Sequence, residues 1–375
     1  MSLQNKIVGP MMQILKLTKA GQLKEATALI QHALRAEKSV APAVQIQPAI
    51  TKISRIEREP SLRIVRAPST AEADVQRVQE GQFITRSFTN EAGTRGYKLY
   101  LPRELRNEMP LVVMLHGCTQ TPDDFAAGTR MNELAERHGF LVAYPAQTRS
   151  ANHANCWNWF SQANQQRDAG EPAIISGLTR QVATDYAVDR RRVYIAGLSA
   201  GGAMANLVAA AYPDVFAAVG VHSGLADGSA HDIPSALAAM KQGGTGSPQR
   251  PRSASTENSR SFVPTIVFHG DKDTTVNPVN GEQVVKQALS RAAGRVSDSG
   301  PVVERGRPEA SGRGRSYTRK IYKDQSGKTL VDHWAIHGAR HAWSGGSSQG
   351  SYTDGQGPEA SGEMFAFFST HALRQ

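Results

Sequence analysis

Cysteine is scarce in this sequence: only Cys118 and Cys156 occur among its 375 residues. Two cysteines are too few for a disulfide-stabilised scaffold, and two alone cannot complete a structural zinc site. We therefore expect a protein held together by an ordinary hydrophobic core, with no bound metal.

Long apolar runs are also missing. No stretch approaches the roughly 18 uninterrupted apolar residues of a membrane-spanning helix, so we expect no integral membrane protein. The N-terminus lacks the pattern of a secretory signal, because Gly9–Pro10 follows Ile7–Val8 directly and Lys16 and Lys19 interrupt the apolar residues beyond it. These absences predict a cytoplasmic location.

Acidic residues are outnumbered, with 33 Asp and Glu against 43 Lys and Arg, which gives a net charge of +10. Residues 1–80 carry twelve basic against seven acidic side chains, and residues 291–323 carry nine against three. Such a surplus can attract nucleic acid or another anionic surface. Both regions lack a core-forming pattern, so we interpret them as a solvated tail and a solvated insertion, with docking to an anionic partner as the alternative. We do not expect a nucleic-acid partner.

The chain divides into three regions by composition. Residues 11–18 and 22–36 have the spacing of two short amphipathic helices, which predicts a helical N-terminal extension over residues 1–37. Residues 38–81 contain four prolines among scattered charges and are typical of a linker. Residues 82–375 form the predicted catalytic domain.

Within that domain, short apolar runs alternate with helical segments. This alternation predicts an α/β fold with a mostly parallel, doubly wound sheet. Two segments rich in Gly, Ser, Pro and Arg, near 225–260 and 294–316, are predicted to be inserted loops or lids. The predicted strands are 83–88, 95–101, 111–115, 140–143, 192–196, 216–221, 264–268 and 330–336, and the predicted helices are 123–138, 172–188, 200–211, 280–293 and 361–373.

The pentapeptide Gly197–Gly201 has the pattern G-x-S-x-G, with Ser199 at its centre. A serine hydroxyl is a weak nucleophile unless a tight turn presents it to a base, and flanking glycines avoid collisions in that turn. The predicted strand 192–196 and helix 200–211 place this motif between a strand and a helix, as the chemistry requires. A second match, Gly346–Gly350, has no strand before it, so we interpret it as a coincidence.

An acid and a base are expected downstream of this serine, in the order acid then histidine. The strand 264–268 is followed by Asp271 and Asp273. We favour Asp273, because Val276 three residues later can fix its loop to the core; Asp271 is predicted to brace the loop.

Eleven histidines compete for the role of base. Two of them, His337 and His341, follow the last predicted strand, 330–336. A histidine deep in the glycine-rich loop after that strand can reach the serine turn. We therefore predict His341 as the base and keep His337 in reserve.

An oxyanion intermediate needs two backbone donors. One is predicted to be the N–H of Ala200, directly after the nucleophile. The other is predicted to be the N–H of Cys118, in the loop after the strand 111–115, because parallel strands bring their carboxyl ends to one edge of the sheet. We do not expect Cys118 to act as a catalytic thiol, since no basic group is placed to activate it.

Five motifs in this order along the chain resemble those of the polyhydroxybutyrate depolymerase and feruloyl-esterase-like branch of the α/β-hydrolases. The resemblance covers about residues 82–375, and it is greatest to intracellular depolymerases whose catalytic domain is of the extracellular short-chain type. It implies an α/β-hydrolase fold. The motifs are His116–Gln120, Cys156–Phe160, Gly197–Gly202, His269–Val276 and His341–Trp343.

The resemblance also implies roles for particular residues. Ser199, Asp273 and His341 would form the triad, with the amides of Ala200 and Cys118 as oxyanion donors. A Cys118–Cys156 disulfide is implied as well, although disulfides are unusual in cytoplasmic proteins. The predicted substrate-binding residues are tryptophans, with ordinary hydrophobic packing as the alternative for each: Trp157, Trp159 and Trp343.

These inferences predict a serine esterase that needs no cofactor and hydrolyses poly(3-hydroxybutyrate) or its oligomers. The expected partners are an ester substrate and the surface of a polyester granule. A feruloyl or acetyl-xylan-type carboxylesterase is the alternative within the same chemistry. An alternative of another class is a protein that docks on granules or nucleic acid with a hydrolase fold.

Overall fold

The computed structural model describes residues 81–244, 262–308 and 314–374. The chain divides into two compact units, Met1–Val75 and Gln76–Gln375, and only the second contains described residues. The predicted N-terminal helices and nearly all of the predicted linker 38–81 therefore lie outside the described residues.

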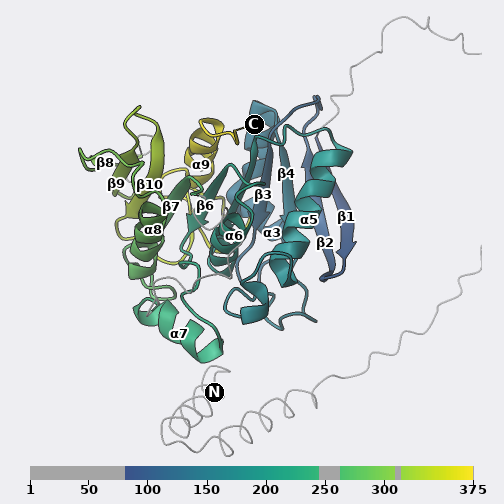
Figure 1. Cartoon of the computed structure of the whole chain (residues 1–375), viewed down its shortest axis with the longest axis horizontal. Helices are drawn as coiled ribbons and strands as arrows, with labels where there is room; N and C mark the ends of the chain where they lie inside the picture. Colours follow the sequence, from purple (N-terminus) through teal and green to yellow (C-terminus); the bar gives the residue numbers. More distant parts are fainter. Residues whose placement is uncertain (1–80, 245–261, 309–313, 375) are drawn as a thin grey trace, which may run out of the picture. The chain divides into compact units, whose positions relative to one another are not determined.

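Ten strands of the described part of the chain form one sheet (Figure 1). Its order is β1-β2-β4-β3-β5-β6-β7-β10-β9-β8. The six central strands, from β4 to β10 in this order, are parallel, and two antiparallel strands flank them on each side. The strands are β1 (Gln82–Asn90), β2 (Gly93–Leu101), β3 (Leu111–Leu115), β4 (Leu141–Pro145), β5 (Val193–Leu198), β6 (Ala218–His222), β7 (Thr265–Gly270), β8 (Val302–Gly306), β9 (Tyr317–Lys323) and β10 (Thr329–Ile336).

Side chains of the central strands alternate between two hydrophobic cores, one on each face of the sheet. In β3, Leu111 and Val113 pack into one core, and Val112 and Met114 pack into the other. Because both faces are covered, the whole strand is buried, which explains its continuous apolar sequence.

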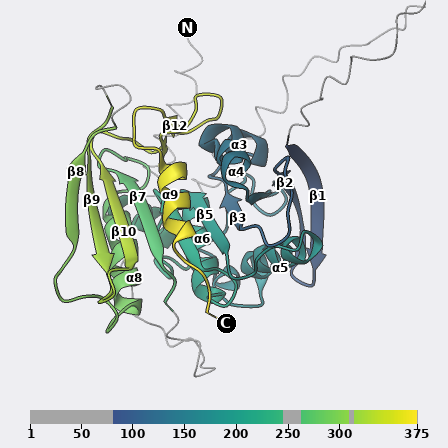
Figure 2. The same ribbon diagram turned by 90° about the horizontal axis from the view of Figure 1, so that it is seen from above.

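Helices cover both faces, so the fold is doubly wound, as predicted. Helices α5, α6 and α8 lie on one face, and α3, α4 and α9 lie on the other (Figure 2). The helices are α3 (Pro122–Thr129), α4 (Met131–His138), α5 (Gly170–Asp185), α6 (Ala200–Ala211), α7 (Ile233–Gln242), α8 (Val279–Arg291) and α9 (Ala360–Ser369), with a short turn η2 (Gln162–Asn164) and a small parallel pair of strands, β11 (Trp343–Ser344) and β12 (Thr353–Asp354). None of the helices among the described residues has the length and apolar character to cross a membrane.

Three sequence predictions about these elements were wrong. The single helix expected over 123–138 is divided, because Arg130 adopts a left-handed conformation (φ 56°) between α3 and α4. The region 225–260, expected to be a loop, contains α7, and the region 294–316 contains β8. Strand β8 is exposed along most of its length and so lacks the apolar run by which buried strands were found.

Candidate active site

Ser199 occupies the sharp turn between β5 and α6. Its backbone adopts φ 58° and ψ −120°, a conformation that costs a non-glycine residue free energy and clusters at functional sites. The turn is held by a hydrogen bond from the Ser199 backbone N–H to the His222 carbonyl, 2.9 Å long. The strand-turn-helix setting predicted for this serine is therefore present.

The glycines on either side of Ser199 allow the first turn of α6 to contact the end of β3. A Cβ on Gly201 would lie 2.1 Å from the Leu115 carbonyl oxygen, and a Cβ on Gly197 would lie 2.4 Å from the backbone of Gly201. These neighbours are main-chain atoms, which have no rotamer to change. The motif therefore requires glycine at both positions for packing.

The second G-x-S-x-G match has different surroundings. Gly346–Gly350 lies in a loop between β11 and β12, where the Ser347 backbone N–H donates to the Gly128 carbonyl of α3 at 2.8 Å. A Cβ on Gly350 would lie 2.5 Å from Gly128, so close loop packing explains its glycines.

Asp273 and His341 are brought together from the loops after β7 and β10. The His341 Nδ1 lies 2.6 Å from the Asp273 Oδ2, and the other carboxylate oxygen accepts the backbone N–H groups of Thr275 (2.9 Å) and Val276 (2.8 Å). Burial raises the pKa of Asp273, but hydrogen bonds from His269 and His341 outweigh burial and hold that pKa well below its usual range. The buried carboxylate is therefore ionised and fixes the orientation of the His341 ring.

His337, the reserve candidate for the base, pairs with Asp271, which was predicted to brace its loop. The His337 Nδ1 lies 3.1 Å from the Asp271 Oδ2, and the His337 Nε2 lies 2.9 Å from the Thr318 hydroxyl. Both ring nitrogens of His337 are thus occupied. The side chains of this pair are 42% and 39% exposed, against 12% for His341 and 0% for Asp273.

The proposed oxyanion donors belong to two segments next to Ser199, the loop after β3 and the start of α6. A Cβ on Gly117 would be 3.7 Å from the Ser199 Cβ, which puts the loop after β3 directly beside the nucleophile. The Ala200 N–H is at the start of α6, where backbone donors have no intrahelical acceptor. Within the described part of the chain, the Cys118 N–H has no backbone or side-chain acceptor.

Neighbouring side chains hold the loop that contains Cys118 in place. The His116 Nδ1 bonds to the Gly117 carbonyl (2.8 Å), and its Nε2 accepts the Gln147 backbone N–H (3.1 Å), so this ring is neutral. Burial lowers the pKa of His116 and favours the same state. The Gln120 side chain accepts the Gly117 N–H at 2.9 Å.

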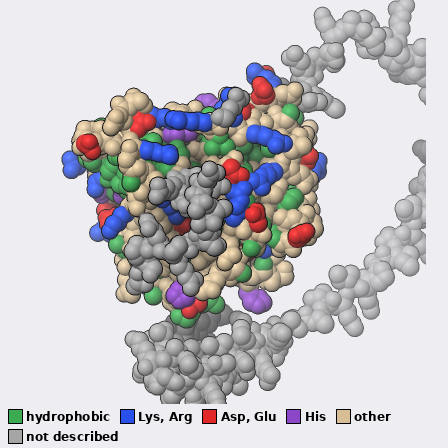
Figure 3. Space-filling view, in the orientation of Figure 1, with side chains coloured by type: hydrophobic (Ala, Val, Ile, Leu, Met, Phe, Trp, Pro, Cys, Tyr) green, Lys and Arg blue, Asp and Glu red, His purple; other side chains and the backbone are tan. Residues whose placement is uncertain are grey.

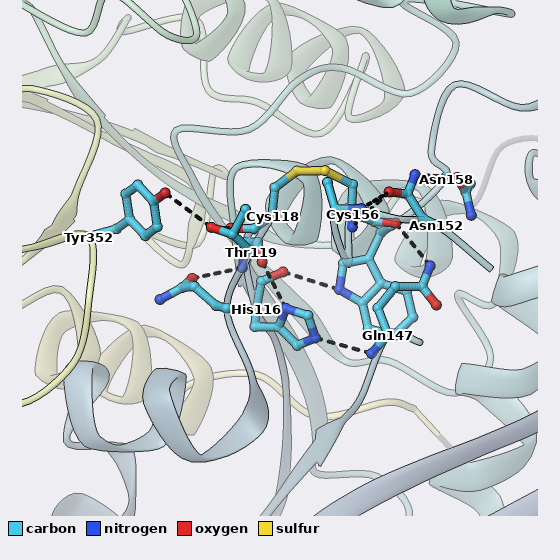
Figure 4. The surroundings of a disulfide bond; sticks show 12 residues. His116, Cys118, Thr119, Gln147, Asn152, Cys156, Asn158 and Tyr352 are labelled. Carbon is cyan, nitrogen blue, oxygen red and sulfur yellow. Dashed lines mark hydrogen bonds between the residues drawn. A yellow bond between two sulfur atoms is a disulfide. The ribbon is translucent and has the colours of Figure 1, made fainter. Parts of the chain in front are cut away.

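Cys118 and Cys156 form the disulfide that the resemblance implied (Figure 4). The bond joins the loop after β3 to the loop after β4. Next to it, the Thr119 N–H donates to the Ala154 carbonyl at 2.7 Å. The Thr119 hydroxyl lies 3.1 Å from the hydroxyl of Tyr352, an exposed aromatic residue that sequence reasoning did not identify (Figure 4).

Two of the three predicted substrate-binding tryptophans are fully enclosed, which corrects that prediction. Trp157 is 0% exposed and donates its indole N–H to the His116 carbonyl, and Trp343 is 1% exposed and donates to the Ser361 hydroxyl. Both pack in the cores and have no surface for a substrate. Trp159 is 6% exposed and stays a prediction.

A buried polar network under the 156–160 loop was also missed. Glu171, at the start of α5, accepts hydrogen bonds from the Asn158 backbone and side chain (2.8 Å each) and from the Gln147 side chain. Arg95 lies 3.4 Å from the same carboxylate. Because each contact joins residues far apart in the chain, no local sequence pattern predicted the network.

Comparison with known proteins identifies the family. Residues 95–306 match the family described as esterase PHB depolymerase. The chain belongs to this family. Its relatives include poly(3-hydroxyalkanoate) depolymerase C of Paucimonas lemoignei, 31% identical over 257 residues that cover 68% of this chain and 59% of the relative. They also include acetylxylan esterase A of Talaromyces purpureogenus, 30% identical over 284 residues that cover 72% of each chain.

The fold is that of the α/β-hydrolases. The solved structure of an acetyl xylan esterase from Aspergillus awamori matches 78% of this chain and 100% of its own, with a TM-score of 0.59 and 23% identity. The chain spans about three fifths of the length of the depolymerase C that it resembles.

The packing at the serine turn predicts that Gly201→Ala is severely destabilising. The added Cβ meets the Leu115 carbonyl, so we expect a loss of about 3 kcal/mol or more in the free energy of unfolding, together with loss of hydrolysis. Urea denaturation measures the first and ester hydrolysis the second. Gly96→Ala is the matched control, since its nearest neighbour is 3.9 Å away, and equal stabilities of the two variants would contradict the packing argument.

The disulfide predicts a redox effect on stability. Cys156→Ala opens a bond that spans 38 residues, so we expect a loss of about 2–4 kcal/mol. A reducing agent should destabilise the wild type by a similar amount and leave Cys156→Ala unchanged, because the chain has no other cysteine pair. Equal urea midpoints for oxidised and reduced wild type would show that the bond adds no stability.

Proposed function

We propose that the chain is a serine esterase that hydrolyses the ester bonds of poly(3-hydroxybutyrate) or of its oligomers. The observation that carries the proposal is the buried Asp273–His341 pair, which lies at the sheet edge where the Ser199 turn is located. Membership of the esterase PHB depolymerase family supports the same chemistry.

The reaction would proceed by acyl transfer. With the Nδ1 proton of His341 donated to Asp273, the Nε2 is the basic nitrogen and removes the Ser199 proton as the hydroxyl attacks the ester carbonyl. The oxyanion would bind the amides of Ala200 and Cys118, each worth about 3–4 kcal/mol of transition-state stabilisation. His341 then protonates the leaving alcohol and activates water to hydrolyse the acyl-enzyme.

The polyester substrate rests on family membership and on the depolymerase C relative. An acetylxylan-type ester is the second candidate, favoured by the alignment with acetylxylan esterase A over 72% of both chains. The same proposed triad would hydrolyse either substrate. The choice between the two therefore depends on the residues that bind the rest of the substrate.

Some basic side chains of the segment 291–323 are paired with acidic residues in the described part of the chain. Arg291 is paired with Asp227, and Arg319 is paired with the buried Asp332 (2.9 and 2.7 Å). On the face drawn in Figure 3, basic and acidic side chains are interspersed. Granule association and a cytoplasmic location stay predictions.

Paired substitutions test the assignment of the triad. Ser199→Ala should lower kcat by at least about 1,000-fold, and Asp273→Asn by about 1,000- to 10,000-fold, because the histidine loses its orienting carboxylate. Asp271→Asn is the matched control and should stay within about threefold of wild type. A larger loss with Asp271→Asn than with Asp273→Asn, measured on p-nitrophenyl butyrate, would reverse the assignment.

A substrate panel tests the polyester proposal. We expect kcat/KM for the 3-hydroxybutyrate trimer to exceed that for acetylated xylan and methyl ferulate by at least about tenfold, a difference within the reach of one pocket. Initial rates at equal ester concentration measure the comparison. A preference for acetylated xylan would contradict the polyester substrate but not the serine esterase chemistry.

A further inference from the structure

His222 is a fully buried histidine at the carboxyl end of β6, between the strands that lead to Ser199 and to Asp273. Its carbonyl accepts the Ser199 backbone N–H at 2.9 Å, the hydrogen bond that holds the nucleophile turn. The mechanism above gives its side chain no part, and no motif in the sequence singled it out.

The ring of His222 bonds to the loop that contains the base. Its Nε2 lies 3.0 Å from the backbone N–H of Ser344, three residues after His341. Because a backbone N–H can only donate, the Nε2 must be the unprotonated nitrogen. The proton is therefore on Nδ1, which lies 3.2 Å from the Ser223 hydroxyl, and the ring is neutral.

The surroundings of the ring also favour the neutral state. It stacks on Phe268 and Trp343, with ring centres 5.7 and 5.1 Å away. Burial lowers the pKa of His222 well below its usual range, and the nearby His269 and His341 lower it further, against an opposing effect of Asp273. The lone pair on Nε2 is thus available to the Ser344 N–H under ordinary conditions.

The loop that contains His341 makes further hydrogen bonds to other segments. The Trp343 and Gly345 N–H groups donate to the Tyr352 and Asp354 carbonyls, and the Ser344 hydroxyl donates to the Pro358 carbonyl. These bonds tie the loop to the 352–358 segment, whose strand β12 pairs with β11 and not with the central sheet. The Lys272 N–H also donates to the Ala339 carbonyl, which ties the loop to the segment after β7. Within the described residues, the ring of His222 supplies the hydrogen bond between this loop and the residue that holds the Ser199 turn.

We propose that His222 is a positioning residue that sets the spacing between Ser199 and His341. Its main chain holds the nucleophile turn and its ring holds the base loop, so one rigid residue joins the two reacting groups. The inference rests on the proposed function, because it assigns Ser199 and His341 the roles of nucleophile and base.

The test compares substitutions that keep or remove the acceptor. His222→Phe keeps a flat ring for stacking but leaves the Ser344 N–H without a partner. We expect kcat to fall about 10- to 100-fold, with KM changed less than about twofold, because misplaced reacting groups slow the chemical step. His222→Gln can present its Oε1 where the Nε2 lies, and should recover most of the lost kcat.

His371→Phe is the matched control. His371 is also buried and its ring also bonds to main-chain carbonyls, those of Thr329 and Phe367, but it lies beside the first residue of β10, away from the active-site edge. This variant should lower the melting temperature without lowering kcat. If both His→Phe variants lower kcat equally, the effect of His222 is general destabilisation and the proposal fails.

Labelling with diisopropyl fluorophosphate tests the proposed function separately from the proposed role of His222. The Ser199 Oγ–P bond forms as the P–F bond breaks, and His341 takes the serine proton. Failure of the wild type to label at Ser199 overturns the proposed function. Labelling of wild type and His222→Phe at equal rates, with equal kcat, overturns the role of His222 alone.

If His222→Phe does not fold, His222→Gln and His222→Asn decide the matter. The asparagine amide is too short to reach the Ser344 N–H, whereas the glutamine amide can reach it. The proposal requires a higher kcat for the glutamine variant at similar KM, and equal values would overturn it.

Discussion

The active-site edge depends on one close contact between main chains. The first turn of α6 approaches the end of β3 so closely that a Cβ on Gly201 would collide with the Leu115 carbonyl, and Ser199 next to it has a positive φ of 58°. The loop after β3 also lies beside the serine, since a Cβ on Gly117 would be 3.7 Å from the Ser199 Cβ. The serine turn and the loop after β3 are thus held together by close packing that requires glycine at position 201.

Asp273 and Asp271 differ in burial and in hydrogen-bond partners. An ionised carboxylate can remain in the interior only when hydrogen bonds replace its water. Asp273 has such donors in His341 and in the Thr275 and Val276 amides, whereas Asp271 stays partly exposed and bonds to an exposed histidine. A rigid, dry carboxylate holds its histidine in one tautomer, which is what acyl transfer needs from the acid.

Local patterns in the sequence were enough to predict the parallel strands and the serine turn, because each leaves a mark within a few residues. The choice of Asp273 over Asp271 as the acid stays a prediction, although Asp273 does pair with His341. Strand β8 was missed because its exposed residues carry no apolar run. Glu171 and His222 were missed for another reason. Their contacts join residues 13 to 122 positions apart, and a glutamate in a helix or a histidine at a strand end has no distinguishing pattern of its own.

The disulfide makes the loop after β3 sensitive to redox conditions. Cys118 supplies a sulfur to this bond, and its backbone N–H is the proposed oxyanion donor, so the bond constrains the residue that carries the proposed donor. The cytosol keeps thiols reduced, and disulfides persist where the surroundings are oxidising. In a reducing compartment this loop would rely on hydrogen bonds such as that from Thr119 to Ala154. Where the bond is formed, it holds the same loop covalently, so the position of the Cys118 amide depends on the redox state of the surroundings.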